Sequence, residues 1–243
     1  MTDPRSGTDP NQSATPPGPP VDGDCLSVNE FLRRYLPYRR HLKAELINGL
    51  VSLNRGVRAD LEDLSNSVIQ SWVRSYAGLT PGTRMDVNTI VILAWDTVPQ
   101  PNIVLRVLSE NGGKSRMTDG GTLKDAPELM VDFTTSHQTF DIRDKLGAFR
   151  RHGVAEYLVW WANDQKLDWF CLEQGKYALN LPDSNGVLTS PSFPGLRLNL
   201  SALLNRNSAA VMATLRRSLE SSEHAGFVAR LEKQCSSNRQ GSS

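Results

Sequence analysis

Two strongly apolar segments with an amphipathic helix between them constrain the fold of this chain more than any other feature. Residues 127–135 (PELMVDFTT) and 156–161 (EYLVWW) combine β-branched and aromatic side chains over strand-like lengths. Between them, residues 140–152 carry apolar side chains three and four positions apart, and Gly153 supplies a helix stop. The pattern predicts a strand, a helix packed on the sheet, and a second strand.

Further elements extend this unit on both sides. Asn48-Gly49 is a good turn dipeptide between two short extended pieces, and Ser27 and Glu30 fit a capping box at the start of a helix. The glycine-rich segment 112–121 is expected to be a flexible loop, since its spacing matches no phosphate-binding motif. We expect strands at 88–94, 103–108, 166–172 and 176–181, and helices at 58–76, 209–219 and 224–233. This order predicts an α/β (α+β) domain with a mixed β-sheet flanked by helices.

The N-terminal segment differs sharply in composition from the rest. Residues 1–24 hold six prolines among small polar residues and almost no large apolar side chain. Such a segment cannot offset its ordering entropy, so we expect a disordered tail. The sequence therefore predicts a folded domain over 25–236 and a short disordered C-terminus over 237–243.

Charge and cysteine content limit the functional classes only broadly. The net charge of +1 neither requires nor excludes nucleic acid, because a binding surface needs only local basic charge. No apolar run is long enough to cross a membrane. Three widely spaced cysteines propose neither a disulfide framework nor a metal site, so a cytoplasmic location is expected.

Polar residues at the strand ends are the candidates for chemistry. Asp132 lies inside an apolar strand, where an unpaired carboxylate is costly, and Glu128 shares its face of the strand. Asn102 begins the preceding strand, and Lys145 lies on the following helix. Carboxylates beside a lysine suit Mg²⁺-dependent phosphodiester hydrolysis, because the hard cation prefers oxygen ligands and the lysine stabilises developing negative charge.

Simpler interpretations exist for each residue. Lys145 and Asp141 are four positions apart on a helix, the usual arrangement of a solvent-facing ion pair. Glu45 precedes a turn and could simply be exposed. His137 and His152 support neither a catalytic triad nor a metal pair.

Taken together, these segments resemble the Uma-type restriction endonucleases, a branch of the PD-(D/E)xK nuclease superfamily. The resemblance covers about residues 40–235 and depends on order and spacing more than on one short motif. The matching stretches are AELINGLV (44–51), TPGT (80–83), QPNIVLRVLSENGG (100–113), APELMVDFTTSHQTFD (126–141), IRDKLGAFRRHGVAEYLVWW (142–161), LDWFCLEQGKYALNLPD (167–183) and GVLTSPSFPGLRLNL (186–200).

The resemblance implies a restriction-endonuclease-like fold and metal-dependent hydrolysis of double-stranded DNA, with Mg²⁺ or Mn²⁺ as cofactor. It places Glu45 at the acidic residue of the first motif and Asn102 at the first sheet carboxylate. Asp132 takes the place of the strand glutamate, and Lys145 that of the lysine on the next helix. Asp132, Asn102 and Glu45 would hold the metal, with Lys145 as the electrostatic group.

Three departures from the family pattern favour weakened catalysis. Asn102 replaces an aspartate and removes a charge whose attraction to a cation is worth about 4 kcal/mol gross at 4 Å. Asp132 is one methylene shorter than glutamate, and Leu61 stands where relatives carry histidine. The alternative is therefore a non-catalytic member that binds DNA or a protein through basic clusters. Palindromic targets would favour a homodimer. The clusters are Arg33, Arg34, Arg39, Arg40 and Lys43, and Arg143, Lys145, Arg150 and Arg151.

Overall fold

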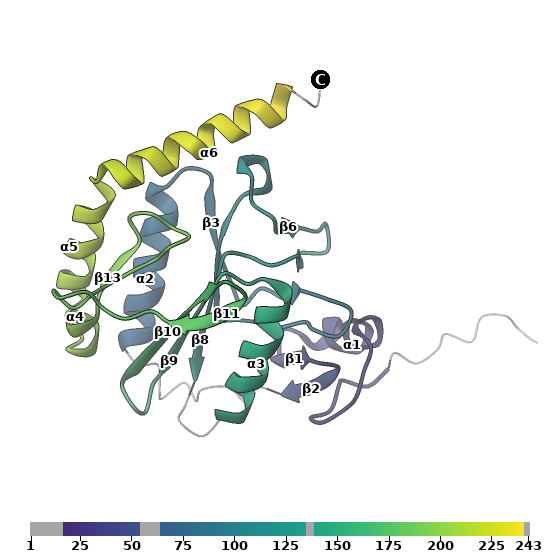
Figure 1. Ribbon diagram of the computed structural model, residues 1–243. Coiled ribbons are helices and arrows are strands. Elements are labelled where there is room, and N and C mark those ends of the chain that lie inside the picture. Colours follow the sequence, from purple (N-terminus) through teal and green to yellow (C-terminus); the bar gives the residue numbers. More distant parts are fainter. Residues whose placement is uncertain (1–16, 54–63, 135–138, 241–243) are drawn as a thin grey trace, which may run out of the picture.

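A six-stranded mixed sheet forms the centre of the protein in the computed structural model, which describes residues 17–53, 64–134 and 139–240 (Figure 1). Its strand order is β11-β10-β9-β8-β5-β3. β8 and β9, which helix α3 connects along the chain, pair in parallel, while the other neighbouring strands are antiparallel. The expected mixed sheet is thus confirmed. The strands are β3 (Thr83–Val87), β5 (Ile103–Val107), β8 (Leu129–Thr134), β9 (Glu156–Trp161), β10 (Lys166–Glu173) and β11 (Lys176–Leu179).

Helices cover both faces of this sheet (Figure 1). On β8, Val131 and Phe133 point into the larger core with α2, α5 and α6, whereas Met130 points toward α3, because successive side chains alternate between faces. Asp132 has the parity of Met130 and so lies on the α3 face. The helices are α2 (Leu64–Leu79), α3 (Thr139–His152), α4 (Leu200–Leu204), α5 (Ser208–Leu219) and α6 (Ser222–Gln240).

An N-terminal layer packs beside α3 and supplies one wall of the candidate site. It consists of α1 (Val28–Tyr35), a 3₁₀ turn at Leu36–Tyr38, and the hairpin β1 (Ala44–Ile47) and β2 (Leu50–Leu53). The hairpin turns at Asn48 and Gly49, whose φ angles of 55° and 80° explain why this dipeptide is used.

The capping box is confirmed in half. The Ser27 hydroxyl accepts a hydrogen bond from the Glu30 amide at 3.3 Å. The Glu30 carboxylate, however, pairs with Arg33 at 2.8 Å instead of reaching back toward the cap. An exposed arginine one turn along the helix is an equally close partner for this side chain.

Some expected boundaries were wrong. One long strand was expected at 88–94. Instead, β3 ends before this range, at Val87, and only the two-residue β4 (Val91–Ile92) lies within it. The supposedly flexible glycine-rich segment contributes β6 (Arg116–Met117), which pairs with β7 (Leu123–Lys124) beside β4. The remaining elements are a 3₁₀ turn at Ser109–Asn111, β12 (Val187–Thr189) and β13 (Arg197–Asn199).

The ends of the folded region also extend beyond the expected 25–236. Arg34 donates to the carbonyl groups of Gly18 and Pro19, and α6 continues to Gln240. The expected disorder of residues 1–16 and 241–243, and the substitution at Leu61, concern positions outside the described residues. Within the described ranges, no helix is both long and apolar enough to cross a membrane.

Candidate active site

Glu45 enters the site from β1, where every residue is buried. The strand is enclosed because β2 pairs with it on one side and a bridge joins Leu46 to Val98 on the other. Glu45 is only 2% exposed, so the interpretation as a surface acid was wrong. Its Oε1 accepts a hydrogen bond from the backbone amide of Gln100 at 2.7 Å. This contact fixes the carboxylate against the chain segment that leads into β5.

Asp132 enters from β8, a central strand with neighbours on both sides. Its Oδ2 accepts two hydrogen bonds, from the Tyr157 hydroxyl at 2.7 Å and from the Lys145 ammonium at 2.9 Å. Within the described residues, no hydrogen bond ends on Oδ1. The parallel register explains the contact with Tyr157, which stands beside Met130 on the same face. Two donors therefore hold Oδ2 of this carboxylate in place.

Lys145 joins the two acids. It shares the buried stripe of α3 with Ile142 and Phe149, three and four residues away, and is 3% exposed. Its ammonium lies 2.7 Å from Oε2 of Glu45 and 2.9 Å from Oδ2 of Asp132. The solvent-facing alternative is thus wrong for Lys145, while the side chain of Asp141 lies outside the described residues.

Asn102 is adjacent to this triad but plays a different structural part. β5 and β8 pair with Ile103 opposite Val131, so continuing the register by one residue sets Asn102 opposite Asp132. The amide oxygen Oδ1 of Asn102 accepts a hydrogen bond from the Phe133 backbone at 3.0 Å. The structure therefore brings all four predicted positions to one end of the β5–β8 pair.

The electrostatic balance of the site favours an ionised Asp132. Burial raises the pKa of Asp132, but the positive charges of Lys145 and Lys43 outweigh it and hold this pKa below its usual value. Two carboxylates and one ammonium leave the triad with a net charge of −1. A buried charge of this kind attracts a cation or a polarised water.

The donor chemistry fits a divalent cation, although the carboxylates are few. Asp132, Glu45 and Asn102 offer oxygen atoms, the ligands that Mg²⁺ and Mn²⁺ prefer. Among the described residues, however, no group of three or more acidic, histidine or cysteine side chains converges as a metal site. A cation here would depend on one amide oxygen in addition to two carboxylates.

Two other acids belong to the fold and not to this site. The Glu128 carboxylate accepts a hydrogen bond from the Val107 backbone at 2.9 Å, and burial raises its pKa. Glu156 is on the opposite face of the sheet, where Trp169, Ser190 and Ser192 donate to it. These contacts give each acid a structural role.

Three supporting residues were not identified from the sequence. Tyr157 orients Asp132, Gln100 holds Glu45 through its backbone, and the Tyr35 hydroxyl donates to Oε1 of Gln100 at 2.5 Å. The only available signals were polar groups in apolar surroundings: a tyrosine in EYLVWW and a glutamine two residues before Asn102. Neither signal specifies a partner without the fold.

A mixed sheet that carries a buried acid on a central strand and a lysine on the next helix defines a restriction-endonuclease-like fold. A crystal structure described as "a putative nuclease belonging to DUF820" from Anabaena variabilis ATCC 29413 shares this fold with a TM-score of 0.53. The match is 15% identical in sequence and covers 67% of this chain and 90% of the other.

The family follows from the sequence itself. A family model described as "Uma2: Putative restriction endonuclease" matches residues 28–201, well over half of the chain, and the protein belongs to this family. No curated protein sequence matches the chain. The matched range includes Glu45, Asn102, Asp132 and Lys145.

Proposed function

We propose that this protein is a metal-dependent DNA endonuclease that hydrolyses phosphodiester bonds at the Glu45–Asp132–Lys145 triad. The observation that carries the proposal is the buried Lys145 ammonium within 2.9 Å of both acids. A solvent-excluded lysine between two carboxylates is costly to maintain for stability alone, since apolar side chains of similar volume often serve as well. Family membership and the nuclease fold support the same reaction class.

Each residue has a distinct role in this mechanism. Asp132, Glu45 and Asn102 would hold Mg²⁺ or Mn²⁺, which supplies a bound water of lowered pKa and polarises the phosphoryl oxygen. Tyr157 and Lys145 fix Oδ2 of Asp132 and so hold the carboxylate in one orientation. Lys145 stabilises the negative charge that develops on the phosphate oxygens.

Plasmid cleavage tests the proposal directly. Supercoiled plasmid is incubated with the protein in Mg²⁺ or Mn²⁺, and with Asp132→Asn and Lys145→Met variants whose folding is verified by circular dichroism. We expect nicking by the wild type and its loss in both variants. Lys166→Met is the matched control, because Lys166 pairs with Asp168 at the same 2.9 Å but its own side chain is 61% exposed. Equal nicking by all four proteins would refute the site assignment.

A second candidate is a non-cleaving DNA-binding member of the family. It is favoured by Asn102, whose neutral amide lies opposite Asp132 where the family resemblance places an aspartate. This candidate predicts no nicking by the wild type and the appearance of nicking in the double variant Asn102→Asp/Asp132→Glu. Failure of the double variant to cleave would show that the loss of activity does not come from these two positions alone.

The proposal extends to the setting in which the enzyme works. We infer a cytoplasmic location, supported by the three cysteines, which are all free thiols. We also infer a homodimer on DNA, since a two-fold axis matches palindromic sites. Light scattering with and without a short duplex tests the dimer, and a constant monomer mass under both conditions would exclude it.

A further inference from the structure

A polar hollow of about 310 Å³ is lined in part by Gln100, the residue whose backbone amide holds Glu45. Arg39, Arg40, Asn88, Thr89, Gln100 and Gly121 are among its lining residues. Two of these residues connect directly to the candidate site: the Gln100 amide donates to Glu45 at 2.7 Å, and the Asn88 amide donates to the carbonyl oxygen of Asn102 at 3.1 Å. Two residues that line the hollow are therefore hydrogen-bonded directly to Glu45 and to Asn102.

The arginines of the hollow differ from the other arginines of the N-terminal layer. Arg33 pairs with Glu30, and Arg34 pairs with Asp24. Arg39 and Arg40 are exposed and form no ion pair with an acid in the described part of the chain. Among the residues that the structure describes, no acid lines the hollow. Two guanidinium groups beside hydroxyl and amide donors are the chemistry that recognises a phosphate.

Hydrogen bonds hold Gln100 and Asn88, two of the residues that line the hollow, in place. The Gln100 side chain accepts from Tyr35 at 2.5 Å and donates to the carbonyl of Asn88 at 2.9 Å. Asn88 itself adopts a φ of 50°, in the left-handed region, which turns the chain at the end of β3. Lining residues that are already fixed in this way lose little conformational entropy when a ligand binds.

Lys43 extends the positive charge of Arg39 and Arg40 along the chain toward Glu45, which follows it by two residues. Its side chain is partly exposed. Arg39, Arg40 and Lys43 thus form one basic segment that directly precedes β1 and the first acid of the triad. Arg39 donates to the carbonyl of Gly120 at 3.5 Å, much as Arg150 of the second basic cluster donates to the carbonyl of Gly175 at 3.4 Å. Arg151 of the second cluster also donates to the side chain of Asn48.

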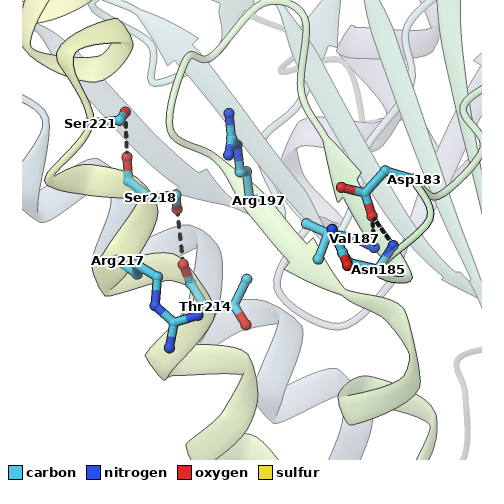
Figure 2. A pocket seen from close by; sticks show the side chains of 8 residues that line it. All are labelled: Asp183, Asn185, Val187, Arg197, Thr214, Arg217, Ser218 and Ser221. Atoms are coloured by element: carbon cyan, nitrogen blue, oxygen red, sulfur yellow. Dashed lines mark hydrogen bonds between the residues drawn. The ribbon is translucent and has the colours of Figure 1, made fainter.

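Another hollow, of about 270 Å³, provides a contrast on the α5 side of the sheet (Figure 2). Arg197 and Arg217 line it together with Asp183, whose carboxylate accepts hydrogen bonds from the backbone of Asn185 and Val187. Arg197 also pairs with Glu223 at 3.1 Å. Acids therefore largely balance the positive charge of this second hollow. In the described residues, no acid lines the hollow at Arg39 and Arg40.

We propose that the Arg39–Arg40 hollow binds a backbone phosphate of duplex DNA next to the phosphodiester that reaches the triad. This inference rests on the proposed function, because it takes the DNA strand as the ligand of the neighbouring site. Contacts of this kind fix the register of a protein on DNA without reading sequence. The hollow therefore positions the strand, and cleavage takes place at the acids.

Fluorescence anisotropy with a labelled duplex in EDTA tests the inference without any cleavage. The double variant Arg39→Gln/Arg40→Gln is expected to bind at least about tenfold more weakly, and its log–log salt dependence should be shallower by about 0.9 for each phosphate that the variant no longer neutralises. Arg216→Gln/Arg217→Gln is the matched control, since both arginines are exposed on α5. Equal affinities and slopes for both double variants would overturn the inference.

Two further measurements separate this inference from the proposed function. If the wild type never nicks plasmid but its binding depends on Arg39 and Arg40, the proposed function fails and the phosphate site stands. If plasmid is nicked but the Arg39→Gln/Arg40→Gln variant binds like the wild type, the phosphate site fails alone.

Discussion

The Lys145 ammonium lies 2.9 Å from Oδ2 of Asp132, although the two residues approach from opposite sides of the space between a helix and a sheet. Thirteen positions separate them in sequence, and the connection between strand and helix intervenes. The contact exists because α3 packs its Ile142–Phe149 stripe onto the sheet face that also carries Asp132. A local surface ion pair within the helix would have needed no such packing.

Loss of Lys145 should destabilise the fold. Lys145→Met leaves Glu45 and Asp132 buried without their shared counter-charge, and breaking a buried pair costs about 3–5 kcal/mol. Chemical denaturation at pH 7 measures the free energy of unfolding. Lys166→Met removes a lysine that is 61% exposed, and Asp168 keeps its hydrogen bond from Trp161, so this variant should cost under about 1 kcal/mol. Similar losses of unfolding free energy in both variants would show that burial of the Lys145 ion pairs adds nothing to the stability of the fold.

The Tyr157 hydroxyl should contribute more than an ordinary tyrosine hydrogen bond. Tyr157→Phe removes a donor to a charged carboxylate, with an expected cost of about 1.5–3 kcal/mol. The control is Tyr177→Phe, whose hydroxyl donates to the neutral carbonyl of Val154 and should cost about 0.5–1.5 kcal/mol. Urea denaturation distinguishes them, and a smaller loss for Tyr157→Phe would contradict an ionised Asp132.

The ionised state of Asp132 should appear in the pH dependence of stability. Its pKa is lowered in the folded protein, so its contribution is present above the unfolded pKa of about 3.9 and is lost as pH falls through the folded value. The difference in unfolding free energy between wild type and Asp132→Asn should therefore be constant near neutrality and shrink below about pH 4. A difference that instead grows toward low pH would mean that folding raises the pKa of Asp132.

Restoring one carboxylate should strengthen cation binding. Asn102→Asp keeps an oxygen for the Phe133 amide and adds a negative charge opposite Asp132. Because a unit charge near 4 Å is worth about 4 kcal/mol gross, Mn²⁺ affinity measured by calorimetry should rise at least about tenfold. The control is Asn185→Asp, on an exposed loop on the other side of the sheet. Equal affinities for both variants would place the cation elsewhere.

Local rules anticipated several elements correctly. Turn dipeptides with positive φ mark two of the hairpins, at Asn48-Gly49 between β1 and β2 and at Gln174-Gly175 between β10 and β11. Apolar length and periodicity located β8, α3 and β9, since these signals depend only on neighbouring residues. The strand expected at 88–94 is in fact only two residues long, because the segment's apolar side chains pack between β7 and the N-terminal layer, which local periodicity cannot reveal.

The sequence by itself therefore determined which segments become strands and helices, and it singled out Glu45, Asn102, Asp132 and Lys145 as candidates. Only the tertiary structure decided that Lys145 is buried, that Tyr157 and Gln100 hold the acids, and that Arg39 and Arg40 form a hollow beside them. Secondary structure follows from contacts between near neighbours in the chain. The charge state and partners of a buried group follow from residues that are distant in sequence and meet only when the layers pack.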